Sequence, residues 1–230
     1  MTPILLVPGL LCTAEIFVPQ IVALWPYGPV TVASTLEGET MAAIAANILA
    51  GAPPRFALAG ISMGGYVCLE IMRQAPERVV KLALLDTSAR PDTPEQSQLR
   101  RDRMARARSE DFAALLAETM SMNLHPDHRN DPELGAISLR GGLAVGVEGM
   151  ARQQNAIITR IDSRPSLGAI AVPTTVIVGD ADPLTPPALA QEMAEAIAGA
   201  KLVVIAHCGH FSTCEQPEAV NRALVEWISD

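Results

Sequence analysis

Short apolar runs alternate with amphipathic stretches along most of the chain. The runs are apolar at nearly every position, which is typical of parallel strands buried on both faces. We expect six such strands, at residues 4–7, 30–33, 56–61, 79–85, 174–178 and 202–205. Between most of them apolar residues recur at helical spacing, so the pattern predicts a parallel α/β sheet with helices on both faces.

Residues 91–165 break this alternation, because three helical patterns (95–108, 109–122 and 147–161) follow one another without a strand. The charge also differs there. From Arg90 to Arg164, eleven arginines balance eleven acidic residues, whereas the rest of the chain has six basic and fourteen acidic residues and carries the whole net charge of −8. We therefore expect an α/β core domain at residues 1–90 and 166–230, with 91–165 inserted as a helical cap.

Composition narrows the class of protein. At 230 residues and 49% hydrophobic content, the chain suits one α/β domain with an insertion. No apolar run approaches the ~18 residues of a membrane helix, and we expect no signal peptide and no membrane association. The acidic balance argues against nucleic acid as a partner.

The cysteines indicate the compartment. Cys12, Cys68, Cys208 and Cys214 show no C-x-x-C spacing, which favours reduced thiols over a disulfide framework. We expect a cytoplasmic monomer or homodimer that acts on a small molecule.

A serine follows the third apolar run in the pattern Gly60-x-Ser62-x-Gly64. A strand before and a helix after make this pattern a nucleophile elbow, unless it is a chance glycine-rich turn. So sharp a turn strains the serine backbone and leaves no room for side chains two residues away on either side. The Met63 backbone N–H then points toward an oxyanion formed on Ser62.

Other candidate residues stand where the remaining runs end. Carboxyl ends of parallel strands meet at one edge of a sheet, where functional residues gather. The ends of the first, fourth, fifth and sixth runs carry residues 8–10, Asp86, Asp180 with Asp182, and residues 207–210. In chain order they supply a loop, Ser, Asp and His, which is the order of the triad in α/β-hydrolases.

Over nearly its full length the chain resembles the α/β-hydrolase superfamily, and it is most similar to small bacterial members related to enol-lactone hydrolases and cofactor-free haloperoxidase-like esterases. The matching segments are residues 6–9, 60–65, 178–186, 208–210 and 215–217. The resemblance implies an α/β-hydrolase fold without the amino-terminal antiparallel edge hairpin, and no cofactor. We expect the six strands in the spatial order second, first, third, fourth, fifth, sixth.

The resemblance also implies the catalytic roles. Ser62 is the expected nucleophile, and His210 the base that takes its proton and returns it to the leaving group. Asp182 fits the spacing of the family's acid loop and would orient the imidazole. Asp86 is the alternative acid, because some members place their acid after the fourth strand, and Asp180 is a candidate structural residue of the loop.

The oxyanion hole is expected from the backbone N–H groups of Leu10 and Met63. One departure from the family concerns the loop that carries Leu10. Many members have His-Gly where this chain has Pro8-Gly9. A side chain that often supports the oxyanion loop is therefore absent.

Two histidine-containing groups resemble metal ligand sets, namely residues 125–128 and the set of His207, Cys208 and His210. Neither has further ligands at suitable spacing, so we expect no metal. His125 and His128 are then solvated loop residues. Cys12 and Cys208 are expected to be packing residues rather than nucleophiles.

The expected function is hydrolysis of a small or medium carboxylic ester or lactone through an acyl-enzyme. The alternatives are a cofactor-free perhydrolase, haloperoxidase or lyase that uses the same triad, and a non-catalytic ligand-binding protein. The pocket is expected to be mostly apolar, and its candidate wall residues are Leu11, Met104, Met120, Met122, Met150 and Leu184.

Five arginines in the predicted cap leave two interpretations open. They are Arg100, Arg101, Arg103, Arg106 and Arg108. They either hold a substrate carboxylate or form a solvated helix face that pairs with Asp102 and neighbouring acids.

Overall fold

The computed structural model describes residues 1–230, apart from the side chain of Met120. Its sheet has six parallel strands in the order β2-β1-β3-β4-β5-β6. The strands are β1 (Ile4–Val7), β2 (Val30–Val32), β3 (Phe56–Ile61), β4 (Val79–Leu85), β5 (Thr174–Gly179) and β6 (Lys201–Ile205). The fold class and strand order predicted from the sequence are confirmed.

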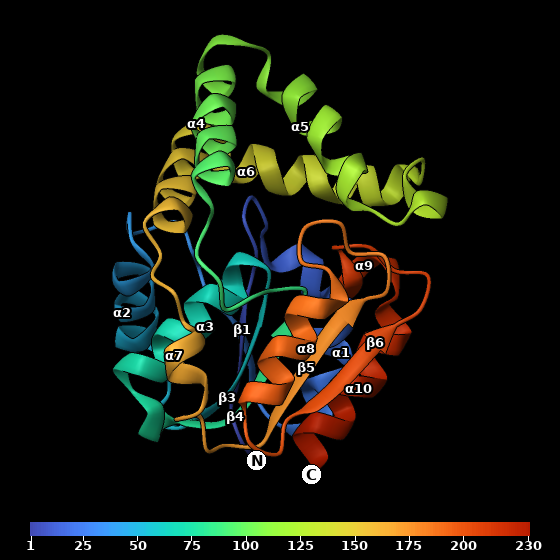
Figure 1. Cartoon of the computed structure of the whole chain (residues 1–230). Helices are drawn as coiled ribbons and strands as arrows, with labels where there is room; N and C mark the ends of the chain where they lie inside the picture. The colour runs from blue at the N-terminus through green and yellow to red at the C-terminus, as the bar shows by residue number, and fades with distance from the viewer.

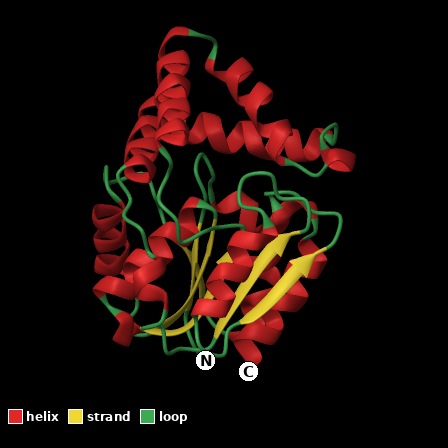
Figure 2. Cartoon of the chain, viewed as in Figure 1, coloured by secondary structure: helices red, strands yellow, loops and turns green.

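Helices cover both faces of the sheet (Figures 1 and 2). On one face lie α2 (Met41–Gly51), α3 (Met63–Gln74), α7 (Arg164–Leu167) and α8 (Pro187–Ala196), and on the other α1 (Val18–Leu24), α9 (Ser212–Glu215) and α10 (Pro217–Ser229). Short 3₁₀ helices η1 (Ala14–Phe17), η2 (Trp25–Tyr27), η3 (Pro76–Arg78), η4 (Ser121–Asn123) and η5 (Pro126–His128) complete the connections. No described helix combines the length and apolar character needed to cross a membrane.

Each face of the sheet has its own core, as the continuous apolar runs predict. Leu58 of β3 is buried against Ile44 of α2 and Met193 of α8 in one cluster. Ala59, the next residue of β3, belongs to the opposite cluster with Leu224 of α10. The inner strands β1, β3 and β5 are buried at every position, and the loops of the candidate site follow their carboxyl ends.

Three helices lie above that edge, coloured green to yellow in Figure 1. They are α4 (Pro94–Ser109), α5 (Phe112–Met120) and α6 (Pro132–Ile158). The helix predicted at 147–161 is only the second part of α6, whose backbone leaves helical geometry at Gly146 (φ 71°, ψ 172°). The division into a core and a cap domain remains a prediction.

The first part of α6 was hidden from sequence analysis by its glycines, which are poor helix formers. Their role is close packing. A Cβ at Gly142 would lie 2.6 Å from the Leu116 side chain of α5, and one at Gly141 would lie 2.9 Å from the Leu11 carbonyl oxygen. The glycines therefore let α6 approach both α5 and the loop after β1.

Candidate active site

Ser62 stands in a strained turn between β3 and α3, with φ 55° and ψ −119°. Its backbone N–H donates to the Leu85 carbonyl at 2.9 Å, which fixes the turn to β4. A Cβ at Gly60 would collide with the Gly64 carbonyl, and one at Gly64 with the Val7 carbonyl. Both glycines are thus required for the approach of α3 to the sheet.

His210 joins Ser62 to Asp182. Its Nε2 lies 2.8 Å from the Ser62 Oγ, and its Nδ1 lies 2.8 Å from Asp182 Oδ2. The Asp182 carboxylate also accepts the Leu184 and Thr185 backbone N–H groups at 2.8 and 2.9 Å and the Thr185 hydroxyl at 2.7 Å. These bonds fix the carboxylate in front of the imidazole.

The ionisation of Asp182 determines which tautomer His210 adopts. Burial by itself raises the pKa of Asp182, but the adjacent His210 and the hydrogen bonds from His210 and Thr185 outweigh burial and lower it below 3.8. An ionised carboxylate only accepts hydrogen bonds, so Nδ1 of His210 carries the proton. The unprotonated Nε2 is then free to accept the Ser62 hydroxyl proton.

The carboxylate of Asp86, the alternative acid, forms hydrogen bonds to groups other than His210. Its Oδ1 accepts the Gly179 N–H at 2.9 Å, and its Oδ2 accepts the Ser212 hydroxyl. Burial and the charge of Asp182 raise the pKa of Asp86 to about 7. In this position Asp86 ties the end of β4 to β5 and α9.

The loop after β1 approaches Ser62 from the other side, since the position of a Gly9 Cβ is 3.4 Å from the Ser62 Cβ. The backbone N–H groups of Leu10 and Met63, expected in the oxyanion hole, have no hydrogen-bond partner among the described residues. When Ser62 attacks a carbonyl carbon, negative charge develops on the carbonyl oxygen, and two unpaired N–H donors can stabilise that charge.

Gln153 of α6 holds this loop and was missed by sequence analysis. Its Oε1 accepts the Leu11 N–H at 3.0 Å, and its Nε2 donates to Thr35 Oγ1 at 3.0 Å. The side chain is fully buried. The one sequence signal was the helical spacing that places Gln153 on the same face as Met150 and Ile157, which are apolar.

Glu215 organises the loop that carries His210. Its carboxylate accepts the Gly209 and Phe211 backbone N–H groups at 3.1 and 3.0 Å, and the His125 N–H at 2.8 Å. The His210 N–H donates to the Asn123 carbonyl at 2.9 Å. The loop after β6 is therefore bound to the chain segment between α5 and α6.

Four residues other than glycine have positive φ, namely Leu11 (61°), Ser62 (55°), Asp86 (42°) and His207 (51°). Each follows the carboxyl end of a different strand. Strained backbone of this kind gathers at functional sites.

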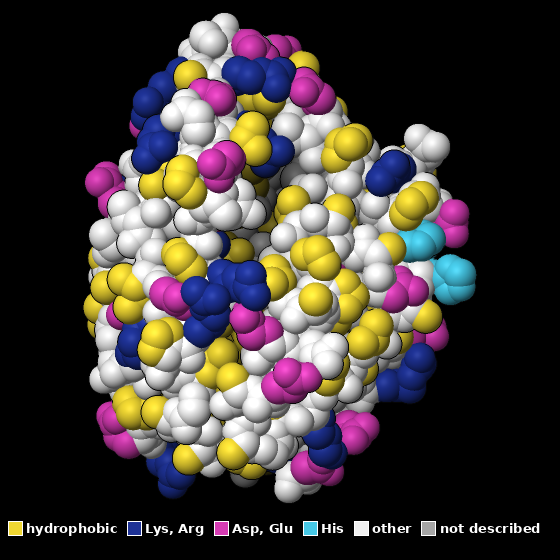
Figure 3. All heavy atoms as spheres, in the orientation of Figure 1, with side chains coloured by type: hydrophobic (Ala, Val, Ile, Leu, Met, Phe, Trp, Pro, Cys, Tyr) yellow, Lys and Arg dark blue, Asp and Glu magenta, His cyan; other side chains and the backbone are white. Residues whose placement is uncertain are grey.

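A cavity of about 470 Å³ opens beside Ser62 and His210, between the sheet edge and the helices above it. The cleft and basic side chains beside it are visible in Figure 3. Of the predicted wall residues, Leu11, Met150 and Leu184 line the cavity. The side chain of Met120 lies outside the described part of the structure.

Two predicted wall residues are corrected, because neither Met104 nor Met122 belongs to the cavity lining. Met122 is 61% exposed in η4. Met104 stands beyond Arg100 at the border of the cavity-facing side of α4, about 100° from Arg103 and about 140° from Leu99, which both line the cavity. Apolar positions of α5 and α6, including Leu115 and Ile157, form walls in their place.

Some of the arginines of α4 lie on a solvated helix face and others line the cavity. Arg106 pairs with Glu110 and Glu118, and Arg108 with Glu148, as expected of a solvated face. Asp102 is not their partner, since its described bond comes from Gln98. Arg100 and Arg103 line the cavity.

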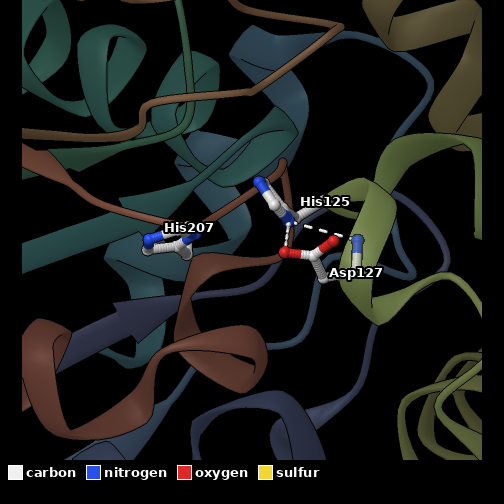
Figure 4. A group of neighbouring side chains, drawn as sticks. All are labelled: His125, Asp127 and His207. Carbon is white, nitrogen blue, oxygen red and sulfur yellow. Dashed lines mark hydrogen bonds and ion pairs between the residues drawn. The ribbon is translucent and has the colours of Figure 1, made fainter.

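His125, Asp127 and His207 lie together outside the cavity (Figure 4), with their nearest ligand-type atoms within 4.8 Å of one another. Asp127 is 72% exposed, and its N–H donates to His125 Nδ1 at 3.2 Å. The expectation of no metal stays a prediction for this turn. His125 and His128 are less solvated than expected, because His125 is largely buried and His128 Nδ1 lies 3.0 Å from Glu215.

Of the two cysteines near the site, Cys12 is half-buried and Cys208 is buried. Burial, with a smaller effect of Cys214, raises the pKa of Cys12 to about 12. Burial also raises the pKa of Cys208 far above its ordinary range. Neither sulfur is a thiolate nucleophile at neutral pH.

Comparison with known proteins agrees with this geometry. A family model described as the alpha/beta hydrolase fold matches residues 38–217. The 3-oxoadipate enol-lactonase 2 of Acinetobacter baylyi is 31% identical over 74% of this chain and 62% of its own length. A Mycobacterium tuberculosis protein named as a non-heme bromoperoxidase is 29% identical over 85% of this chain and 74% of its own.

The fold matches solved enzymes of similar length. A thermophilic esterase from Thermogutta terrifontis superposes with a TM-score of 0.89 at 33% identity, covering 100% of this chain and 90% of that one.

Proposed function

The chain belongs to the α/β-hydrolase family, and on that premise we propose that it is a serine hydrolase that cleaves small or medium carboxylic esters or lactones. The observation that carries the proposal is the contact of Ser62 Oγ with His210 Nε2, backed by Asp182 at the edge of the cavity. The enol-lactonase and esterase relatives support this class of reaction.

The reaction proceeds in two halves. His210 Nε2 takes the Ser62 proton while Oγ attacks the carbonyl carbon, and the N–H groups of Leu10 and Met63 bind the oxyanion. Collapse of the intermediate breaks the ester bond, and His210 gives its proton to the departing alkoxide. Water, deprotonated by His210, then attacks the acyl carbon. The bond from that carbon to Ser62 Oγ breaks, His210 returns the proton to Oγ, and the acid is released.

We propose a cytoplasmic location, because the spacing of the four cysteines favours reduced thiols. The net charge of −8 supports the proposal that the protein has no nucleic-acid partner. We propose that the protein is a monomer or a homodimer.

The test combines Ser62→Ala with a fluorophosphonate probe. The variant should fold and lose turnover of short-chain p-nitrophenyl esters by roughly 10⁴-fold or more. Wild-type protein should be labelled once, at Ser62, and Ser88→Ala, which changes another cavity serine, should still be labelled. Full esterase activity in Ser62→Ala overturns the proposal.

The bromoperoxidase name of one relative makes a second outcome worth measuring. Peracid formation or peroxide-dependent halogenation that is faster than hydrolysis would favour the perhydrolase alternative. Ligand binding without an acylation burst on any ester or lactone would favour a binding protein.

A further inference from the structure

Helix α4 presents to the cavity a cation, Arg103, that forms no ion pair with a described acidic side chain. Arg103 lines the cavity and is half-buried. Within the described part of the chain it forms no ion pair and no side-chain hydrogen bond. Burial and the charges of Arg100 and Arg106 lower the pKa of Arg103, and the opposing effect of Glu118, which is itself paired with Arg106, is smaller. A guanidinium remains protonated at neutral pH.

The other arginines of the cavity are already paired. Asp92, whose side chain is 1% exposed, lies between Arg100 at 2.6 Å and Arg160 at 2.7 Å. Arg90 pairs with Glu192 at 2.9 Å. Arg103 is therefore the lining arginine without a described partner.

The cavity is positively charged in an acidic protein. Its lining includes four arginines and one aspartate, whereas the whole chain carries −8. A half-buried charge without a partner loses part of its hydration, and a bound counter-charge compensates that loss. The remaining wall is largely apolar, from Leu99, Phe112 and Leu115 among others. This environment fits an aliphatic ligand that carries an anionic group.

We propose that Arg103 binds a free carboxylate of the substrate, so that the preferred substrate is an ester or lactone whose aliphatic part ends in a carboxylate. A carboxylate matches the single unpaired guanidinium in charge and presents two oxygens to its planar fork. The inference rests on the proposed esterase function.

The test compares monomethyl adipate with dimethyl adipate, which differ in one free carboxylate. Wild-type protein should prefer the monoester in kcat/KM. Arg103→Met should lower the ratio of kcat/KM for the two esters by about 10–100-fold, mainly through KM for the monoester, because a charge-assisted hydrogen bond is lost. Arg103→Lys should restore part of the ratio.

Arg101→Met is the matched control, since Arg101 is exposed on the same helix and does not line the cavity. It should keep the wild-type ratio. Equal losses on both esters in Arg103→Met, or no preference in the wild type, would overturn the carboxylate site while leaving the esterase function intact.

Absence of turnover on both esters would instead count against the proposed function. Arg103 is then tested directly by titrating free adipate into Ser62→Ala and Ser62→Ala/Arg103→Met in a calorimeter. Binding to the first protein at least tenfold tighter than to the second supports the site, and equal binding or none overturns it.

Discussion

The Oε1 of Gln153 accepts the backbone N–H of Leu11 at 3.0 Å, so a helix of the cap segment holds the loop that approaches the nucleophile. Many family members support this loop with a histidine where this chain has Pro8. Gln153 reaches the loop from α6 and also binds Thr35, which fixes the orientation of its amide. We interpret Gln153 as a positioning residue for the Leu10 N–H.

Gln153→Met removes the hydrogen bonds of the side-chain amide to Leu11 and Thr35 at nearly constant volume. We expect kcat for a neutral ester to fall about 10–100-fold with little change in KM, because a loose Leu10 N–H weakens oxyanion binding. The free energy of unfolding should fall by about 1–3 kcal/mol, since buried partners lose their hydrogen bonds. Steady-state kinetics and chemical denaturation measure the two effects.

Asn155→Met is the control for Gln153, because Asn155 is exposed on the same helix. It should leave both quantities near wild type. A loss of stability in Gln153→Met without a loss of kcat would assign Gln153 a purely structural role.

Paired substitutions distinguish the roles of Asp182 and Asp86. Asp182→Asn should reduce kcat by roughly 10⁴-fold, because an amide favours the wrong tautomer of His210. Asp86→Asn should reduce it by less than about tenfold, since the Asp86 carboxylate is bonded to Gly179 and Ser212. The reverse order of losses would make Asp86 the acid.

Activity should depend on pH in a defined direction. Burial by itself lowers the pKa of His210, but the charge and hydrogen bond of Asp182 and the charges of Asp86 and Glu215 raise it above 6.5. A base with a raised pKa holds its proton to higher pH, so kcat/KM should rise through a midpoint above 6.5. Asp86→Asn removes one of the raising charges and should move this midpoint to lower pH. A pH profile of both proteins with a non-ionising ester measures the shift, and an unchanged or higher midpoint would contradict it.

Metal removal should have no effect. Dialysis against EDTA is expected to leave kcat and the melting temperature unchanged, because Ser62, His210 and Asp182 need no ion for the proposed chemistry. If EDTA lowers the melting temperature and His207→Ala reproduces that loss, the turn of His125, Asp127 and His207 holds a metal after all. Metal analysis of the untreated protein provides the control.

The fold was predictable because its signals are local. Continuous apolar runs mark β1 and β3, and the glycines around Ser62 mark the turn that α3 needs. The structure also brings Ser62, His210 and Asp182 within hydrogen-bond distance, as their positions after three strands led us to expect. Their catalytic roles stay predictions until the variants are measured.

The missed features depend on contacts between distant segments. Gln153 and Leu11 are 142 residues apart, and nothing near either residue in the sequence signals the other. Glycines hid the first part of α6, because the same residue weakens a helix and lets it pack closely. Met104 was wrongly assigned to the cavity wall because the sequence does not show which side of α4 faces the cavity.

The left-handed backbone at Leu11, Ser62, Asp86 and His207 also matters for protein engineering. Replacing such a residue with glycine relieves backbone strain, and it raises thermostability where the added flexibility of the unfolded chain does not offset that relief. In this protein that rule would select positions that each follow a strand at the candidate active site, Ser62 among them. A screen ranked by melting temperature alone would therefore enrich stable, inactive variants, and thermostabilisation should instead begin in the two cores beneath the sheet edge.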